Sequence, residues 1–328
     1  MSASHRRTFI GGALAIALSL TAVACGDSDD SSSASGLEKT KITLGTMTVA
    51  DTAPVQIAID KGLFKAEGLE VTTQVIQGGA AGIPLLKSGR LDFSFGNYVS
   101  LLTAAVKDPG FKPKIVAEGF QSDSKTHTLM VRKDSPYRTI EDLKGKKIGV
   151  NTKRNISTLL VRAAGKPQNI DFDEDKDFVE IAPPAMEQAL KSESVEAVQA
   201  IEPFGTQMQQ SMGARMVADL SSGATADFPI AGYAATEKFI QEHPKTTAAF
   251  QRALQKAQGM AADRKLVQDT LPTYAKGIDE KVAATMNYGS FPTTLSATRL
   301  QRVADVMLQF GYVDEKIDIK QYIAESAA

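Results

Sequence analysis

The chain has 328 residues, of which 43% are hydrophobic, and its 37 Lys and Arg nearly balance 38 Asp and Glu, for a formal net charge of −1 at pH 7. A balanced chain without a basic block argues against a nucleic-acid partner. Its single cysteine excludes an internal disulfide framework. At this length one hydrophobic core nears its practical limit, so we expect two lobes.

The first 24 residues have the pattern of an export signal. Arg6 and Arg7 precede the apolar run FIGGALAIALSLTAVA, and small residues lie just before Cys25. This order of regions is typical of a signal peptide, and the run is shorter than the roughly 20 residues that span a bilayer. We predict a signal peptide over residues 1–24. The pair in HRRTFIG resembles a twin-arginine signal, so the Sec and twin-arginine routes both stay open.

The residues around Cys25 resemble a bacterial lipobox. AVAC places small residues before the cysteine, although Ala22 stands where Leu is most common. The tract that follows, GDSDDSSSASG, is too polar to fold and suits a flexible tether. We expect acylation of Cys25, a lipidated tether over 25–39, and a protein anchored to the outer face of the cell membrane. The alternative is a plain signal peptide with an incidental cysteine.

Strand and helix patterns alternate along the next part of the chain. Strands are predicted at 41–46, 69–76, 91–96, 114–120, 127–133, 146–151, 177–182 and 195–201. Helices are predicted at 54–68, 82–89, 98–107, 156–165 and 185–192. This alternation predicts an α/β fold with mixed, mostly parallel sheets and flanking helices.

After FPIAGYAAT the patterns become purely helical, at 246–264, 279–289 and 296–311, and Ser296 is a plausible N-cap for the last of them. A helical tail after two α/β runs suggests that the chain returns to cover the first lobe.

Catalytic motifs are absent from the sequence. It has no nucleophile elbow, no zinc-protease spacing and no phosphate-binding loop. His127 opens a predicted strand and His243 precedes Pro244 at a helix boundary, so we interpret both as structural. We therefore expect no catalytic residue, no metal and no cofactor.

Gly-, Asn- and Thr-rich loops follow the predicted strands. In open parallel sheets, ligands bind beyond the carboxyl ends of strands, where helix N-termini offer free N–H groups. The qualifying loops are TMTVADTAP, QGGAAG, FGNYVS, VNTKRNIS and IEPFG, the last after what we take as the final strand of the second lobe. The alternative is that these loops are ordinary connections.

An ordered set of motifs resembles the extracytoplasmic substrate-binding proteins of ABC importers, in the group of nitrate-, sulfonate-, taurine- and thiamine-precursor-binding proteins. The motifs are APVQIAIDKGLFKAEGLEV, GGAAGIPLLKSGRLDFSFGN, DLKGKKIGVN, IEPF and GYAATEKFIQEHPKTTAAFQRALQKA. The resemblance covers nearly all of residues 40–325. It implies a two-lobed clamshell of the periplasmic-binding-protein type II fold, in which residues 40–124 and 230–328 form lobe 1 and residues 125–229 form lobe 2. The crossovers are expected near Gly119–Thr128 and Ala226–Tyr233.

The resemblance also implies ligand-binding positions in the cleft. These are Asp51, Thr52, Gly78, Gly79, Gly96, Asn97, Tyr98, Asn151, Asn155, Ile156, Ser157, Thr158, Glu202 and Tyr233. The chain departs from the family at NTKRNIST, where relatives often carry a Gly- and Ser-rich loop.

The charge of the ligand stays open at this point. Lys153 and Arg154 beside a helix start favour an anion, unless they are simply solvated. Glu202, if it faces the cleft, favours an amine. Because the chain has no Trp, the candidates for stacking on a ligand are Phe95, Tyr98, Phe120, Phe204 and Tyr233.

The function that the resemblance implies is a non-catalytic receptor. It would bind a small polar or charged solute, such as a sulfonate, a nitrate-like anion or a pyrimidine thiamine precursor, and deliver it as a monomer to an ABC permease and ATPase. The alternatives are an enzyme of the same fold, similar to pyrimidine-precursor synthases, and a ligand-sensing surface lipoprotein.

Overall fold

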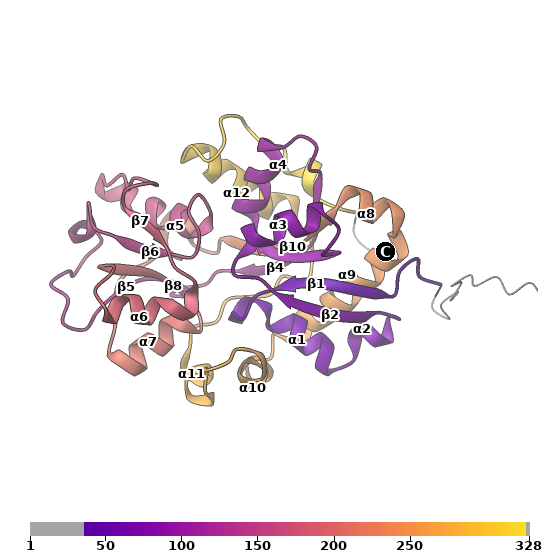
Figure 1. Ribbon diagram of the computed structural model, residues 1–328, viewed down its shortest axis with the longest axis horizontal. Helices are drawn as coiled ribbons and strands as arrows, with labels where there is room; N and C mark the ends of the chain where they lie inside the picture. The colour runs from indigo at the N-terminus through magenta and orange to yellow at the C-terminus, as the bar shows by residue number, and fades with distance from the viewer. Residues whose placement is uncertain (1–35, 326–328) are drawn as a thin grey trace, which may run out of the picture. The chain divides into compact units, whose positions relative to one another are not determined.

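Two five-stranded sheets organise the part of the chain that the structure describes, residues 36–325 of a computed structural model (Figure 1). The predictions for residues 1–24, for Cys25 and for most of the tether concern residues outside this range. Sheet A has the strand order β2-β1-β3-β10-β4, formed by β1 (Lys41–Thr46), β2 (Glu70–Val75), β3 (Phe93–Asn97), β4 (Pro113–Gln121) and β10 (Pro229–Thr236). Sheet B has the order β7-β6-β8-β5-β9, formed by β5 (His127–Val131), β6 (Ile148–Val150), β7 (Phe178–Glu180), β8 (Ala197–Ile201) and β9 (Arg215–Asp219).

The two sheets share one plan. In sheet A, β1 pairs in parallel with β2 and β3, while β10 pairs antiparallel with β3 and β4. In sheet B, β6 pairs in parallel with β7 and β8, while β5 pairs antiparallel with β8 and β9. Each sheet thus has one reversed strand among five. The prediction of mixed, mostly parallel sheets is confirmed.

Helices connect the strands, as the alternating pattern predicts. They are α1 (Ala53–Asp60), α2 (Leu63–Ala66), α3 (Gly79–Lys87), α4 (Tyr98–Lys107), α5 (Ile156–Gly165), α6 (Met186–Lys191), α7 (Phe204–Met212), α8 (Glu237–Glu242), α9 (Pro244–Met260), α10 (Arg264–Tyr274), α11 (Glu280–Thr285) and α12 (Ala297–Gln309). In sheet A, α1, α2 and α9 cover one face, and α3, α4 and α12 cover the other (Figure 1).

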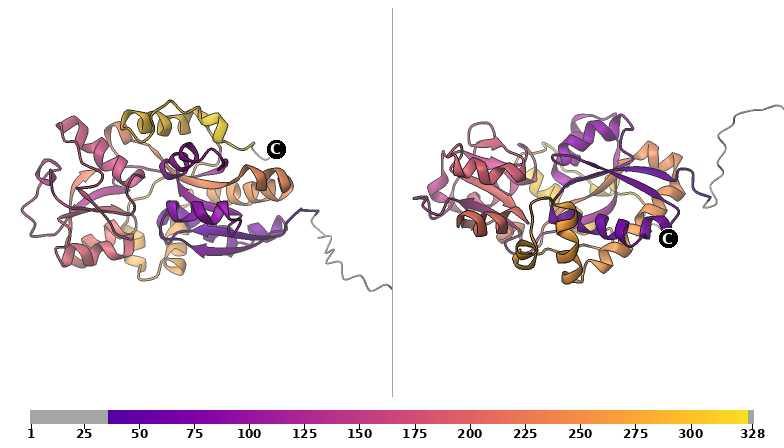
Figure 2. Two further views of the ribbon diagram at one scale, coloured as in Figure 1. Left: turned by 45° about the horizontal axis from the view of Figure 1, so that its top comes forward. Right: turned by 60° about the horizontal axis from the view of Figure 1, so that its bottom comes forward.

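The C-terminal helices return to sheet A. Helix α9 contacts β4 and α1, and α12 contacts α4 and β10. Figure 2 shows this orange and yellow segment running beside the indigo and purple strands. The stacked rings of Phe93 and Phe250, with centroids 4.0 Å apart, join β3 to α9 in the core. None of the helices described is long and apolar enough to cross a membrane.

The structure corrects the predicted elements in several places. The helix predicted over 54–68 divides into α1 and α2 at Gly62, which has a left-handed φ of 66° that favours glycine. Strand β10, which lies between β3 and β4 in sheet A, and helices α8 and α10 were not predicted. Strand β9 and helix α7 were not predicted either, so IEPFG does not follow the final strand of sheet B. Both segments are locally ambiguous, because β9 is a half-exposed edge strand and α7, FGTQMQQSM, is mostly polar.

Two connections link the sheets. Residues 122–126 join β4 to β5, and residues 220–228 join β9 to β10. The first is shorter than the predicted crossover, because β4 continues to Gln121 and β5 begins at His127. The second lies earlier in the chain than predicted, because β9 ends at Asp219 and β10 already begins at Pro229. The strands of sheet A lie within 41–121 and 229–236, and those of sheet B within 127–219. The exact division of the chain into two lobes stays a prediction.

Candidate functional site

A cavity of about 40 Å³ is lined by residues that belong to both sheets and their loops. The lining residues are Met47, Val49, Asp51, Gly79, Phe95, Asn97, His127, Asn151, Ile156, Ser157, Ile201, Ile230 and Ala231. Larger surface hollows, of about 490, 300 and 200 Å³, are each lined by elements around sheet A alone. We place the candidate site in the smaller cavity, because polar groups of both sheets converge there.

The strand ends explain this convergence. Residues 47–51 follow β1, Asn97 ends β3, Asn151 follows β6 and Ile201 ends β8. Carboxyl ends of parallel strands, and the N-termini of the helices that follow them, meet at one edge of a sheet. Two hydrogen bonds join the edges of the two sheets here, from Ala50 N to Glu202 O at 3.2 Å and from Asn151 Nδ2 to Gln77 O at 3.0 Å.

Three helices begin at the cavity. Asn97 caps α4 by accepting a 2.8 Å hydrogen bond from Ser100 N, and Asn155 caps α5 by accepting one of 2.9 Å from Ser157 N. Helix α3 begins at Gly79 without a side-chain cap. A β-carbon at Gly79 would lie 2.7 Å from the Cα of Gly96, so the close contact of these two loops requires glycine.

Asp51 is the one carboxyl group in the cavity lining, which contains no Lys or Arg. The side chain is 6% exposed, and burial raises its pKa from the ordinary value of 3.8 to about 7. Its own backbone N–H is the single group that opposes this shift. Within residues 36–325, no other residue donates a hydrogen bond to this carboxylate. Asp51 is therefore a buried acid whose carboxylate accepts no hydrogen bond from another residue in the described range.

His127 also lines the cavity, although the sequence alone indicated a structural role. Its ring is 2% exposed, its Nδ1 lies 3.3 Å from Thr126 Oγ1, and burial lowers its pKa to about 4. At pH 7 the imidazole is neutral and supplies no positive charge to a ligand. The sequence feature that could have indicated its place in the site is its position, because His127 begins β5 directly after the connection between the sheets.

The structure brings six of the predicted residues into the lining, Asp51, Gly79, Asn97, Asn151, Ile156 and Ser157. Gly78 and Gly96 lie beside it. The Thr52 hydroxyl instead donates to the carbonyls of Met47 and Val49, and Asn155 and Thr158 form the capping box of α5. These last three side chains serve local structure.

The predicted aromatic residues are mostly core residues. Phe95 lines the cavity. Tyr98 and Tyr233 are 1% and 0% exposed, and the Tyr233 ring contacts those of Phe95 and Phe250. Phe120 packs on Phe291, and Phe204 is buried at the start of α7. Of the five candidates for stacking on a ligand, the structure therefore supports Phe95.

Glu202 does not line the cavity, contrary to the expectation that it faces the cleft. Its carboxylate is buried and accepts four hydrogen bonds. Thr206 donates its N–H at 3.1 Å and its hydroxyl at 2.9 Å, and Asn287 donates its N–H at 3.1 Å and its Nδ2 at 3.0 Å. These donors satisfy both oxygens. Glu202 therefore joins the start of α7 to the segment after α11.

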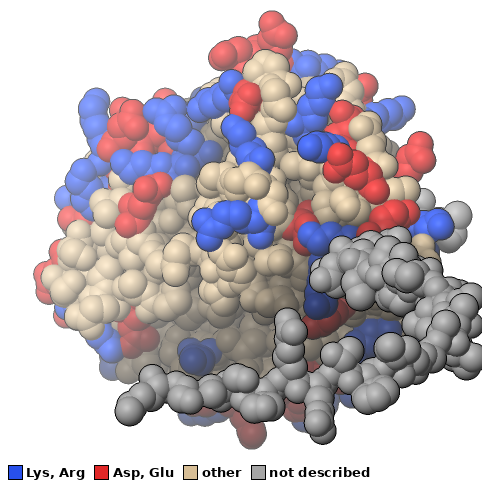
Figure 3. Space-filling view, turned by 45° about the vertical axis from the view of Figure 1, so that its right-hand side comes forward, with Lys and Arg blue, Asp and Glu red and all other residues tan. Residues whose placement is uncertain are grey.

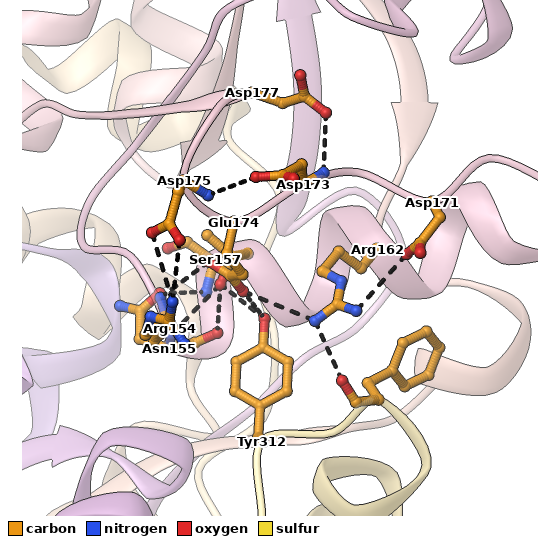
Figure 4. A network of polar contacts seen from close by, with 12 residues as sticks. Arg154, Asn155, Ser157, Arg162, Asp171, Asp173, Glu174, Asp175, Asp177 and Tyr312 are labelled. Atoms are coloured by element: carbon orange, nitrogen blue, oxygen red, sulfur yellow. Dashed lines mark hydrogen bonds and ion pairs between the residues drawn. The ribbon is translucent and has the colours of Figure 1, made fainter.

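Lys153 and Arg154 also lie outside the lining. Figure 4 shows Arg154 in an acidic network next to the start of α5. The Arg154 guanidinium contacts Asp175 at 3.2 Å, and Lys153 Nζ donates to the Asp175 carbonyl at 3.2 Å. In the same network the Tyr312 hydroxyl contacts Thr158 Oγ1 at 2.7 Å and donates to Glu174. The anion preference inferred from these two cations has no support in the geometry.

The outer surface offers no rival charged site on the face drawn in Figure 3, where basic and acidic side chains are interspersed. Among the residues described, no group of three His, Cys, Asp or Glu side chains is placed to hold a metal ion.

A two-sheet α/β body with a polar cavity where the strand ends meet is the architecture of periplasmic binding proteins. The chain belongs to the NMT1-like family, whose model matches residues 35–271. It is 23% identical over 283 residues to a protein of Bacillus subtilis (strain 168) named for binding aliphatic sulfonates. The aligned region covers 83% of this chain and 82% of that protein.

Solved structures share the fold. The alkanesulfonate-binding protein SsuA from Xanthomonas axonopodis pv. citri, bound to MOPS, aligns with a TM-score of 0.72 at 16% identity, covering 87% of this chain and 98% of SsuA. The periplasmic nitrate-binding protein NrtA from Synechocystis PCC 6803 aligns with a TM-score of 0.70 at 15% identity, covering 87% and 85%. The predicted family resemblance and the fold class are confirmed.

Proposed function

We propose that this protein is the extracytoplasmic solute-binding receptor of an ABC importer, and that it binds a small polar solute in the cavity between the two sheets. One observation carries the proposal. Asp51 and Asn97 on the sheet A side and Asn151 and Ser157 on the sheet B side line one cavity, and all of them except the half-buried Asn151 are buried. Buried polar groups are costly unless they are hydrogen-bonded, and a polar ligand would supply the missing partners.

The relatives support the same class of function. Their names refer to sulfonate and nitrate binding, and a ligand-binding component of an ABC-type import system from Staphylococcus aureus shares the fold with a TM-score of 0.73 at 17% identity. Periplasmic location is part of the NrtA name, which supports export of the present chain. By the same reasoning its partners are a permease and an ATPase.

The size of the cavity implies that binding involves motion. About 40 Å³ exceeds the roughly 10–15 Å³ that one water requires, but lies far below the roughly 300–1,000 Å³ of pockets for larger ligands. We propose that lobe 1 (40–124 and 230–328) and lobe 2 (125–229) open about the connections 122–126 and 220–228 to admit the solute. A few connecting residues suffice as the hinge for this kind of closure.

Two further elements belong to the proposal. Cys25, acylated after removal of residues 1–24, would hold the receptor at the outer face of the membrane through a flexible tether. The body would be non-catalytic and monomeric. A pyrimidine-precursor synthase-like activity is less well supported, because the lining has one neutral histidine and no lysine. A sensing lipoprotein would differ in lacking permease and ATPase partners.

The test is a thermal-shift screen of the full chain in mild detergent against sulfonates, nitrate, bicarbonate, amino acids, polyamines and pyrimidine precursors. A ligand at about 100 times its Kd stabilises the fold by about 2.7 kcal/mol, which the screen resolves. Ser157→Leu, which fills the cavity, should abolish the shift, whereas Ser211→Leu on the exposed face of α7 should retain it. A shift that survives Ser157→Leu would move the site elsewhere.

Co-purification from host membranes tests delivery. Crosslinking should recover permease and ATPase subunits with the receptor. Recovery of the receptor without them, under conditions where the solute binds, would favour the sensing role.

A further inference from the structure

The sign of the charge in the cavity depends on one residue. Of the thirteen lining residues, twelve are apolar or uncharged at neutral pH, and His127 is among them because burial disfavours its imidazolium. The predicted ligand cations, Lys153 and Arg154, contact Asp175 instead. The predicted ligand carboxylate, Glu202, is saturated by Thr206 and Asn287. Asp51 is therefore the residue whose charge a ligand meets.

The surroundings of Asp51 leave its carboxylate open on the cavity side. Thr52, the next residue, directs its hydroxyl to the carbonyls of Met47 and Val49, and the Tyr274 hydroxyl donates 2.8 Å to Val49 O. The nearby Tyr233 hydroxyl is buried and has no hydrogen-bond partner within residues 36–325. The hydrogen-bond donors that could satisfy Asp51 are thus committed to other acceptors or remain unused.

We propose that Asp51 selects a ligand with a protonated nitrogen, such as an aliphatic ammonium or an amidinium group, and holds that nitrogen by a charge-assisted hydrogen bond. This inference rests on the proposed receptor function and names its substrate class. Charge-assisted pairs are roughly twice as strong as neutral ones, and a cation removes the cost of burying an unpartnered carboxylate.

The remaining polar groups suit the other end of such a ligand. The Ser157 hydroxyl and the Asn97 Nδ2 donate no hydrogen bond to any residue between 36 and 325, and both side chains line the cavity. They can donate to carboxylate, sulfonate or carbonyl oxygens. A small molecule with an amino group at one end and oxygen acceptors at the other matches both sets. A purely anionic solute would instead face the Asp51 carboxylate without a compensating cation.

The pH dependence of affinity separates this model from one in which a protonated Asp51 donates to an anion. A cation favours the ionised carboxylate, so its binding releases a proton and its affinity increases as pH rises from 5.5 to 7. An anion that accepts from the carboxylic acid takes up a proton, so its affinity decreases over the same range. The two models predict opposite slopes for the wild-type chain.

The experiment is calorimetric titration of the full chain with pairs of probes that differ by one amino group. The pairs are 2-aminoethanesulfonate with ethanesulfonate, and β-alanine with propionate. Ethylamine and nitrate serve as controls that carry a single charge. We expect the amino member of at least one pair to bind at least about tenfold tighter, which corresponds to about 1.4 kcal/mol. Its affinity should rise with pH. Asp51→Asn should remove the advantage, and the matched variant Asp92→Asn should retain it, because Asp92 pairs with Lys39 and Thr43 N outside the cavity.

Three results would overturn the inference. Tighter binding of the amine-free acids or of nitrate would reverse the ligand class while leaving the receptor function in place. An amine advantage that survives Asp51→Asn, or that falls as pH rises, would remove Asp51 from recognition. Failure of every probe to bind, together with a thermal-shift hit on a solute that has no protonated nitrogen, would overturn this inference and leave the receptor function in place.

Discussion

The Asn151 side chain, which follows β6 in sheet B, donates a 3.0 Å hydrogen bond to the carbonyl of Gln77, which follows β2 in sheet A. Gly78 lies beside this contact, and a β-carbon there would stand 2.7 Å from Asn151 Oδ1. Gly78 has an extended backbone, so alanine is tolerated by the local chain and conflicts only with the opposite loop. The contact therefore depends on glycine because two loops approach closely.

Gly78→Ala should weaken solute binding without unfolding the body. The added methyl overpacks the Gln77–Asn151 contact, and overpacking costs about 1–3 kcal/mol, or about 5–150-fold in affinity if the cost falls on the closed state. Titration calorimetry and small-angle scattering with and without solute measure the effect. The control is Gly259→Ala in α9, whose β-carbon meets nothing nearer than 4.0 Å. Equal affinities of the two variants would argue against closure at this contact.

Asp51→Asn should stabilise the ligand-free fold increasingly as pH rises. Between the ordinary pKa of 3.8 and the folded pKa of about 7, the folded chain holds a proton on Asp51 that the unfolded chain releases, so this group makes folding less favourable as pH increases. The unfolding free energy of Asp51→Asn, minus that of wild type, should grow by about 1.4 kcal/mol per pH unit from pH 4 to 7. Urea unfolding at several pH values measures this difference.

The pH dependence of the unfolding free energy has to be compared between variants, because His127 contributes to it in wild type as well as Asp51. Its pKa falls from the ordinary 6.5 to about 4 on folding, so the unfolded chain holds the extra proton, and stability from this group increases as pH rises between these values. In wild type the two slopes nearly cancel. His127→Gln should therefore change the pH slope in the opposite direction to Asp51→Asn, and a difference that is constant with pH would contradict the assignment for either residue.

Glu202→Gln should reduce stability more than it reduces ligand affinity, the reverse of what a cleft-facing Glu202 implies. The amide cannot accept all four hydrogen bonds from Thr206 and Asn287, so at least one buried donor loses its partner. Such losses cost about 1–3 kcal/mol. Chemical denaturation with and without solute separates the two effects, with exposed Glu315→Gln as the control. If Glu202→Gln loses solute binding while its unfolding free energy is unchanged, Glu202 contacts the ligand and does not serve mainly to stabilise the fold.

Cys25→Ser should release the protein from membranes without altering the folded body. The reason is that acyl chains on the cysteine supply the membrane affinity in the proposed anchor. Fractionation of host cells and mass spectrometry of the N-terminus measure it. Ala22→Leu, which improves the lipobox match, should stay anchored. A Cys25→Ser protein that remains fully in the membrane fraction would require another means of attachment.

Much of the secondary structure was predictable because its signals are local. Helices α4 and α5 begin and end at the predicted residues, 98–107 and 156–165, since apolar spacing and the flanking strands define them. Strand β9 and helix α7 escaped prediction, because a half-exposed edge strand and a polar helix depend on their neighbours in space for stability. Local pattern thus accounts for most of the core strands, although it missed the buried strand β10 between β3 and β4.

The candidate site was predictable in position but not in detail. The loops that carry Asp51, Asn97 and Ser157 follow from the rule that ligands bind beyond strand ends, since connectivity brings these loops to one edge. The family resemblance then singled out these residues within the loops. Glu202 and Tyr233 occupy equally suggestive places along the chain, yet their side chains are enclosed by Asn287 and Phe250, which are distant in sequence. His127 likewise lines the cavity because segments that are distant in sequence pack around it.

The sequence by itself thus determined the family, the α/β alternation and the loops that meet at the cavity, because these depend on local periodicity and chain order. The tertiary structure decided which charges face the cavity. Lys153, Arg154 and Glu202 have hydrogen-bond or ion-pair partners that the local sequence does not predict. The Asp51 carboxylate, in contrast, has no partner from another residue in the described range. Side-chain orientation and burial, and therefore the sign of the field at the site, arise only when distant segments pack together.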